Sequence, residues 1–254
     1  MSSEGPSALD PMLRKLQRRA PFDPADREAL LALPHDVRTI EPGRYVVREG
    51  DAPTHCCAIL SGFACRHKLV SDGSRSIGAV HMKGDIADLQ NSLLGRADHN
   101  VQTLTRSEIA FIPREAIRLL AAAKPAIGIA MWHDTLIDGS ILREWIANLA
   151  RRDAATRLAH LLCEFAIRIE HVGIGDRFRF ELPMTQEQLA DATGLTPVHV
   201  NRTLRDLEQR GLISRNVRTV AIADWDRIRE AADFNAAYLH LPDEVAVTNH
   251  EDRP

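Results

Sequence analysis

The residues of this chain that are best suited to chemistry with another molecule lie in the last third of the sequence. Thr185 is a candidate helix N-cap, and Gln188 three residues later completes a capping box. Gly194 permits a left-handed residue and therefore a sharp turn, after which Thr196 caps a second helix with Pro197 at its first position. The pattern predicts two short helices that cross at a steep angle, which is the geometry of a helix-turn-helix.

The second predicted helix has a buried face and a face that can read DNA. Val200, Leu204 and Leu207 follow the i, i+4, i+7 spacing of a buried stripe. Arginine can donate two hydrogen bonds to guanine, and asparagine can pair in the same way with adenine. A recognition helix presents its N-terminal outward residues to the major groove. We therefore predict these base-reading residues: Pro197, Val198, His199, Asn201, Arg202 and Arg205.

A wing is predicted directly after the second helix. Two short β-rich runs, residues 211–213 and 219–222, lie on either side of a turn at Asn216. The tip of such a wing faces the DNA backbone, and threonines at helix N-termini also suit contacts with phosphate. We therefore predict these backbone-contacting residues: Thr185, Thr196, Arg215 and Arg218.

The charge of the chain is concentrated in this segment. The whole sequence has a net charge of −3, but residues 196–220 contain five arginines against one aspartate and one glutamate. The position of a basic face decides whether it attracts DNA, whatever the total charge. A helical hairpin with a solvated polar face is the alternative, but that fold does not require the cap, the turn glycine and the wing in this order.

The elements that must position this motif are predicted from length and patterning. A chain of 254 residues fits two modest domains. Short β-rich runs at 45–47, 57–60, 63–70, 77–81 and 109–112 alternate with glycine-containing turns, as in a β-roll or barrel. We predict an α+β fold with an N-terminal double-stranded, jelly-roll-like β-roll, a long dimerisation helix and a C-terminal winged helix-turn-helix.

The predicted domain boundaries follow these changes of pattern. A short helix begins at the signal Asp23-Pro24, and a second helix is expected from Ala154 to Glu170. The expected parts are a polar lead (1–22), a β-roll sensor domain (23–124), the dimerisation helix (125–152), the winged helix-turn-helix domain (153–226) and a C-terminal tail (227–254).

The long helix is apolar over a wide arc. Its apolar residues recur at steps of three and four, and a helix of this kind buries more than one side. One face can cover the β-roll while the other meets the same helix of a second chain, although packing within one chain is the alternative. The residues predicted at the dimer interface are Trp132, Leu136, Gly139, Leu142, Ile146 and Leu149.

With these features placed, residues 20–225 resemble the Crp/Fnr family of bacterial transcription regulators. The turn glycines at 43, 50, 62, 73 and 84 look like the frame of that family's cyclic-nucleotide-binding-type β-roll, and residues 195–202 are similar to its recognition helix. The resemblance implies a homodimer that binds a twofold-related DNA site and contacts RNA polymerase. It places Arg202 at a base-contacting position, whereas Val198 stands where many members carry a base-reading glutamate.

The effector site departs from the family pattern. Members that bind cyclic AMP carry a Gly-Glu-Leu segment and an Arg-Ser pair, where this chain has Ala-Asp-Leu at 87–89 and Ala-Asp at 97–98. A carboxylate without the arginine clamp repels a phosphate, and Arg96 would serve only after a register shift. We expect an effector other than cyclic AMP, or constitutive DNA binding. The possible effector site comprises Ala87, Asp88, Leu89, Arg96, Ala97 and Asp98.

The cysteines and histidines of the β-rich region raise a second possibility. Cys65 and His67 are two residues apart and share one face of a strand, while His55, Cys56 and Cys57 belong to the strand before. A haem, a metal or a redox switch is conceivable there. The spacing matches no recognised ligand set, and the first 55 residues lack cysteines for an iron–sulfur cluster. We therefore expect buried packing roles, with no metal and no cofactor.

Other function classes have little support in the sequence. It contains no recognised nucleophile, phosphate-loop or metalloprotease motif, so we expect that it is not an enzyme. Neither a signal sequence nor an apolar run of membrane-spanning length is visible, so we expect a cytoplasmic protein. The alternative function is a β-roll small-molecule-binding protein whose C-terminal module mediates protein interaction. The tail at 233–241 is expected to pack on the DNA-binding domain.

Overall fold

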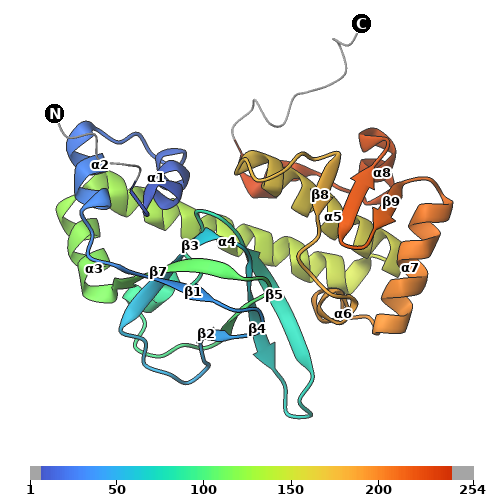
Figure 1. The fold of residues 1–254 in the computed structure, drawn as a ribbon, viewed down its shortest axis with the longest axis horizontal. Coiled ribbons are helices and arrows are strands. Elements are labelled where there is room, and N and C mark those ends of the chain that lie inside the picture. The colour runs from blue at the N-terminus through green and yellow to red at the C-terminus, as the bar shows by residue number, and fades with distance from the viewer. Residues whose placement is uncertain (1–6, 242–254) are drawn as a thin grey trace, which may run out of the picture. The chain divides into compact units, whose positions relative to one another are not determined.

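The computed structural model describes residues 7–241 of the chain, which divides into two compact units, residues 1–138 and 139–254 (Figure 1). We call them the N-terminal unit and the C-terminal unit. Helix α4 (Pro125–Arg151) is one continuous helix of 27 residues that runs through the boundary between the units. The predicted fold class of a β-roll, a long helix and a winged helix-turn-helix is confirmed.

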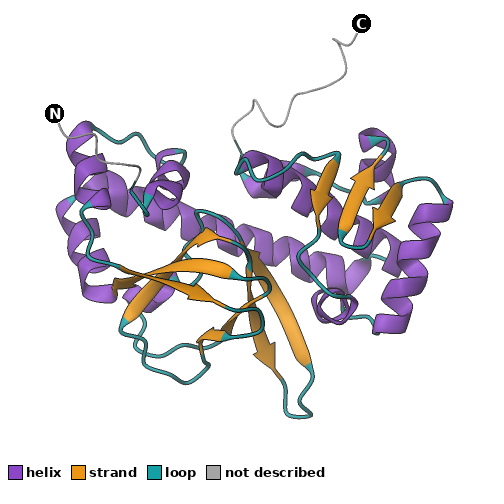
Figure 2. Ribbon diagram, viewed as in Figure 1, coloured by secondary structure: helices purple, strands orange, loops and turns teal. Residues whose placement is uncertain are grey.

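The N-terminal unit contains two antiparallel sheets (Figure 2), with strand orders β1-β7-β3 and β2-β6-β4-β5. The predicted β-rich runs lie in β2, β3, β4, β5 and β7, whereas β1 and β6 were not expected from the sequence. The strands are β1 (Asp36–Ile40), β2 (Tyr45–Val47), β3 (His55–Ser61), β4 (Ala64–Leu69), β5 (Arg75–His81), β6 (Asn100–Thr103) and β7 (Ser107–Pro113).

Strand β3 contributes to two hydrophobic cores because its two faces are both covered. Cys57 and Ile59 point into the core between the two sheets, while Cys56 and Ala58 point into a core shared with helices. Successive side chains of a strand point to opposite faces, so a strand that is buried on both sides has no polar alternation. This explains the uninterrupted apolar run of residues 56–60.

Helices cover the second face of the β1-β7-β3 sheet. They are α1 (Asp10–Gln17), α2 (Pro24–Leu31), α3 (Arg114–Ala123) and the first half of α4, and a short 3-10 helix, η1 (Leu89–Ser92), lies between β5 and β6. Asp23 caps α2 as predicted. The expected polar lead does not describe residues 10–17, which form α1, because Leu9, Met12 and Leu16 are fully buried in the core.

The C-terminal unit consists of the second half of α4, further helices and one small sheet of order β8-β10-β9. Its elements are α5 (Ala154–His171), β8 (Arg179–Glu181), α6 (Gln186–Thr193), α7 (Pro197–Gln209), β9 (Ile213–Asn216), β10 (Thr219–Ile222), α8 (Trp225–Ala231) and η2 (Ala236–Leu239).

The last described residues pack on this unit, as expected for the tail. Phe234 and Leu239 are buried in it, whereas tail residues 242–254 lie outside the described part of the chain. None of the helices formed by residues 7–241 has the length and apolar character needed to cross a membrane.

A close approach of α1 to the turn after β5 gives a test of the N-terminal packing. Gly84 has a φ of +92°, and a Cβ atom there would lie 2.8 Å from the carbonyl oxygen of Pro11. Gly73 has a similar φ of +86°, but nothing lies within 4 Å of its Cβ position. Both Gly→Ala variants therefore meet backbone strain, but only Gly84→Ala meets a backbone atom.

We expect Gly73→Ala to lower the free energy of unfolding by about 1–2 kcal/mol and Gly84→Ala to lower it by roughly a further 1–3 kcal/mol. Urea denaturation of both variants measures the difference. Equal losses in the two variants would show that α1 does not pack against Gly84.

Candidate nucleic-acid interface

Helices α6 and α7 form the predicted helix-turn-helix, and their local geometry follows from their caps. The Thr185 hydroxyl accepts a hydrogen bond from the Gln188 backbone N–H at 3.2 Å, and the Gln188 side chain accepts one from the Thr185 N–H at 2.8 Å. Gly194 ends α6 in the left-handed conformation with a φ of +63°, and Thr196 caps α7. These caps and this turn are confirmed.

Helix α7 has the predicted division between its two faces. Val200, Leu204 and Leu207 are buried, whereas Val198 is 81% exposed. An apolar side chain this exposed at the start of a helix has no packing role within the described part of the chain.

The polar residues of the outer face of α7 are not equally available. The side chains of Arg202 and Arg205 are exposed and make no hydrogen bond within residues 7–241. Asn201 is half-buried, and its amide donates to Gln186 Oε1 at 3.2 Å. His199 is also half-buried. The two arginines therefore have the most accessible donors on this face.

Ion pairs decide which arginines of the basic segment can meet a phosphate. Arg210 pairs with Asp206 at 3.4 Å, and Arg215 donates to Glu208 Oε2 at 2.7 Å. The hydrogen bond from Arg215 also lowers the pKa of Glu208. Both acids of the segment are therefore neutralised by neighbouring arginines, and the excess positive charge rests on the remaining three, Arg202, Arg205 and Arg218.

Strands β9 and β10 form the predicted wing. The turn lies one residue later than predicted, because β9 extends over Ile213–Asn216 and Asn216 pairs with Thr219, which leaves Val217 and Arg218 as the two-residue turn at the tip. Val217 is 99% exposed, and its φ of +53° is unusual for a β-branched residue. Arg218 is exposed at this tip, but Arg215, which we predicted beside it, is half-buried and turned toward α7.

Arg157 on α5 supports the turn of the motif, a role that the sequence did not reveal. Its guanidinium donates to the carbonyl oxygen of Thr193 at 2.6 Å and to that of Arg152 at 3.0 Å. Thr193 ends α6, and Arg152 directly follows α4. Arg157 therefore joins the helix-turn-helix to the end of the long helix.

Helix α4 has two apolar faces. Met131, Ile137 and Trp145 are buried, while large apolar side chains on the other face are exposed within the described chain. The exposed residues are Ile129, Trp132, Leu136, Leu142 and Ile146. Gly139 lies in the gap of this stripe, where a Cβ would meet only the flexible end of Arg143. Leu149 is half-buried instead, with its Cδ2 atom near the Cβ position of Gly194.

The residues of the possible effector site serve the fold of the N-terminal unit. Asp88 is fully buried and accepts hydrogen bonds from the Cys57 backbone N–H at 2.7 Å and from the Asn91 amide at 3.3 Å. Ala87, Leu89 and Ala97 are buried as well.

Arg96 and Asp98, unlike Asp88, lie on the exposed side of the possible effector site. Arg96 donates to the carbonyl oxygen of Gly50 at 3.0 Å, and the Asp98 carboxylate meets the ring of His99. The hydrogen bond to His99 lowers the pKa of Asp98, so the carboxylate stays negative at neutral pH.

Two ion-pair groups that sequence reasoning missed hold α4 within the N-terminal unit. Arg66 on β4 donates to Asp138 Oδ2 at 2.6 Å and to the carbonyl oxygen of Ala87 at 2.8 Å. Lys15 on α1 lies 2.9 Å from Asp85 and 2.8 Å from Asp134. Charged residues inside apolar strands and helices were the signal that could have revealed them, because buried charges need partners.

The cysteines are buried thiols. Burial raises the pKa of Cys56 to about 12 and holds that of Cys57 and Cys163 well above the ordinary value. Among residues 7–241, no cluster of three or more histidine, cysteine, aspartate or glutamate side chains has the arrangement needed to bind a metal ion. The geometry favours packing roles for Cys56, Cys57 and Cys65.

Comparisons with known proteins cover both units. Residues 37–124 match the cyclic nucleotide-binding domain family, and residues 156–231 match the Crp-like helix-turn-helix domain family. The nitrogen fixation regulation protein FixK of Rhizobium meliloti (strain 1021) is 28% identical over 204 residues, which cover 77% of this chain and 87% of that protein. The fumarate and nitrate reduction regulatory protein of Escherichia coli (strain K12) is 24% identical over 197 residues, covering 77% and 78%. The structure of FixK2 from Bradyrhizobium japonicum has a TM-score of 0.72 and 21% identity, and the match covers 78% of this chain and 98% of that chain.

Asp88 gives a pH-dependent test of the N-terminal unit. Burial raises the pKa of its carboxyl from 3.8 to about 6. The folded state therefore keeps a proton that the unfolded state loses, and the contribution of this group to stability falls as the pH rises from about 4 to about 6. Asp88→Asn removes the titration, and the Asn91 amide can turn its unpaired oxygen toward the new donor.

We expect the free energy of unfolding of Asp88→Asn to rise relative to that of the wild type by on the order of 2–3 kcal/mol when the pH is raised from 4 to 7. Asp88→Ala should be less stable than Asp88→Asn at both pH 4 and pH 7, because the buried Cys57 N–H loses its acceptor. Urea denaturation of the three proteins at both pH values measures these differences. A constant gap between Asp88→Asn and the wild type would contradict the raised pKa.

Proposed function

Because this chain belongs to the Crp/Fnr family of transcription regulators, we propose that it binds DNA as a homodimer and reads a twofold-related site through the outer face of α7. One observation carries the proposal: the exposed face of α7 presents Arg202 and Arg205, which make no hydrogen bond within residues 7–241, while both acids of the basic segment are neutralised. This face suits bases and phosphates better than it suits a protein partner of mixed charge.

We assign different tasks to the residues of this face. Arg202 donates two hydrogen bonds to a guanine in the major groove, and Arg205 contacts the DNA further along the helix. Val198 offers its methyl groups to a thymine methyl, a contact that a glutamate at this position cannot make. The half-site therefore differs from that of relatives with a glutamate there. Pro197, His199 and Asn201 border these contacts.

Backbone contacts set the register of the motif on the DNA. The hydroxyls of Thr185 and Thr196 accept hydrogen bonds in their caps, so the hydroxyl hydrogens stay available to phosphate oxygens. Arg218 at the tip of the wing meets a neighbouring phosphate. Arg215 acts through Glu208 and supports the wing rather than touching DNA.

The exposed face of α4 supports the homodimer. A stripe of large apolar side chains at steps of three and four is the pattern of helix pairs that pack along their length. The small residue Gly139 allows two copies of the helix to approach closely. Leu149 contributes less to this interface, because it already packs near Gly194.

The effector and the transcriptional partner are parts of the proposal that follow from the family. The β-roll acts as the sensor domain for an effector other than cyclic AMP, since Ala97 and Asp98 stand where the Arg-Ser pair that holds a cyclic phosphate would be needed. Constitutive DNA binding is the other outcome. RNA polymerase is the partner on DNA, as the resemblance implies.

Selection from a random duplex pool, followed by substitution of Arg202, tests the DNA-reading role. We expect the ligand-free protein to retain inverted repeats with half-sites about one helical turn apart. Arg202→Ala should weaken binding by about 1–3 kcal/mol and relax the preference at one base position. Arg218→Ala should weaken binding to all sequences and lower the slope of the salt dependence by about one. Anisotropy titrations with single-base variants separate the two effects.

The matched control is Arg106→Ala, an exposed arginine in the N-terminal unit, which should leave binding unchanged. Binding without any base preference in the wild type would contradict the reading role and support an interaction module instead.

Substitution of one exposed apolar residue of α4 tests the homodimer. Leu136 is 57% exposed and belongs to the stripe, while Leu119 on α3 is similarly exposed but lies outside it. A charge in the interface loses hydrophobic contact and is desolvated without a partner. We expect Leu136→Glu to be a monomer by sedimentation and Leu119→Glu to remain a dimer. A monomeric wild type would rule out α4 pairing.

A further inference from the structure

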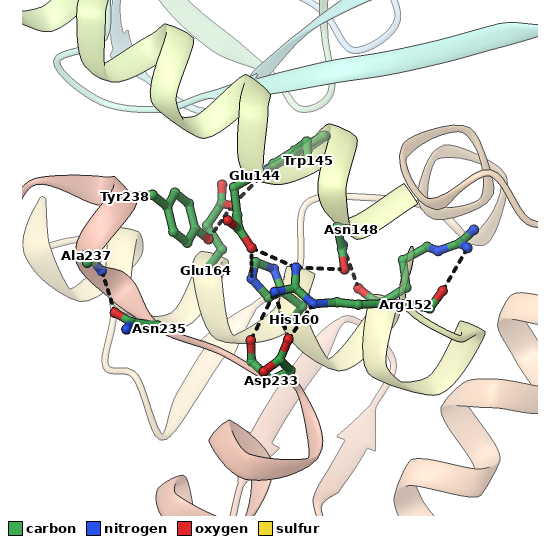
Figure 3. A network of polar contacts seen from close by, with 11 residues as sticks. Glu144, Trp145, Asn148, Arg152, His160, Glu164, Asp233, Asn235, Ala237 and Tyr238 are labelled. Atoms are coloured by element: carbon green, nitrogen blue, oxygen red, sulfur yellow. Dashed lines mark hydrogen bonds and ion pairs between the residues drawn. The ribbon is translucent and has the colours of Figure 1, made fainter. Parts of the chain in front are cut away.

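One buried carboxylate joins three segments of the C-terminal unit (Figure 3). Glu164, in the middle of α5, is 1% exposed. Its Oε2 atom accepts hydrogen bonds from Trp145 Nε1 on α4 and from the Tyr238 hydroxyl on η2, both at 2.8 Å. The Arg168 guanidinium donates to the other carboxylate oxygen, Glu164 Oε1, at 3.1 Å and so neutralises the charge of Glu164. A single oxygen therefore ties the long helix and the C-terminal segment to α5.

A second connection runs along the end of α4. Arg152 donates to Glu144 Oε1 at 2.7 Å and to Asp233 Oδ2 at 3.1 Å (Figure 3). Glu144 belongs to α4, whereas Asp233 begins the last described segment in the left-handed conformation, with a φ of +47°. The C-terminal segment is thus held to α4 by an ion pair as well as by Glu164.

Aromatic packing fills the space between these polar contacts. The rings of His160 and Tyr238 stack with centroids 5.8 Å apart, and Phe234 meets the His160 ring edge-on at 5.1 Å. Burial raises the pKa of Tyr238, and the nearby charge of Glu164 acts in the same direction. The phenol therefore keeps its proton and remains a donor.

We propose that residues 233–239, which we call the C-terminal clasp, fix the angle between α4 and α5 and thereby set the half-site spacing that the dimer accepts. Tyr238 and Asp233 are positioning residues in this scheme and do not touch DNA. The inference rests on the proposed function, because it concerns how two reading helices are spaced.

The exposed stripe of α4 is connected to α7 through the contacts between α4 and α5 that the C-terminal clasp stabilises. Ile146, on the exposed stripe, neighbours Trp145, which bonds to Glu164 on α5. Helix α5 in turn holds the turn of the motif through Arg157. A change in the angle between α4 and α5 therefore moves α7 relative to the dimer axis.

The clasp is separate from the internal order of the helix-turn-helix. The capping box of α6 and the cap of α7 involve none of residues 233–239. Loss of the clasp should therefore leave each helix-turn-helix intact but allow the distance between the two helix-turn-helices of the dimer to vary. This difference distinguishes a positioning role from a general loss of structure.

The test compares Tyr238→Phe and Asp233→Ala with the wild type in the full-length protein. Tyr238→Phe removes one hydroxyl but leaves Glu164 bonded to Trp145 and Arg168, and Asp233 has an exposed side chain, so both variants should fold. Tyr45→Phe is the matched control, since Tyr45 lies on β2 in the N-terminal unit. The probes are duplexes with the selected half-sites at the preferred spacing, at spacings one or two base pairs longer or shorter, and with a single half-site.

Each added base pair turns one half-site about the DNA axis by roughly 35°, so a rigid dimer discriminates strongly between spacings. We expect the preference for the best spacing to fall about three- to tenfold in each clasp variant, as for one lost hydrogen bond. Affinity for the single half-site should change less than about twofold. The Tyr45→Phe profile should match the wild type.

The outcomes separate this inference from the proposed function. Clasp variants with the wild-type spacing profile would overturn the clasp and leave the DNA-reading dimer standing. Equal losses on every duplex, including the single half-site, would also overturn it, because they indicate general destabilisation. A wild type that shows no spacing preference would overturn both.

Discussion

Helix α4 imposes the constraint on which the rest of the structure depends, because it is apolar on two faces. The hydrophobic effect favours covering both of them. The chain covers one face with its own cores, through residues such as Ile137 and Trp145, and leaves Trp132, Leu136 and Ile146 uncovered. The same helix is continuous through the boundary of the two units. The proposed pairing through the uncovered face would therefore act on a helix whose second half belongs to the same unit as the helix-turn-helix.

Local signals in the sequence predicted the DNA-reading motif well. The caps at Thr185 and Thr196 and the turn at Gly194 depend on residues at most four positions apart, so spacing alone specifies them. Helix α1 was missed although Leu9, Met12, Leu13 and Leu16 follow helical spacing, because basic residues surround them. Strands β1 and β6 were missed because they are short and mostly polar, so that neither an apolar run nor a regular alternation marks them.

Side-chain partners distant in the sequence could not be predicted. Arg215 and Arg218 are the same residue type in the same predicted wing. They differ in the folded chain because Arg215 reaches Glu208 on α7, whereas Arg218 stays exposed. Tyr238 and Glu164 are 74 positions apart, and no periodicity relates a tyrosine in the tail to a glutamate in a helix. Residue spacing therefore locates the outer face of α7, whereas the three-dimensional fold determines which side chains near that face remain available to contact DNA.

The contacts that hold α4 in both units are directional as well as hydrophobic. Glu164 and its donors fix the second half, and the pair of Arg66 with Asp138 fixes the first. Buried charges add little net stability, because desolvation offsets the attraction, but they are satisfied in few geometries. Apolar contacts alone would let a helix slide, whereas these groups favour discrete arrangements. Loss of one such pair would therefore be expected to favour another discrete position of α4 over a continuous range of positions.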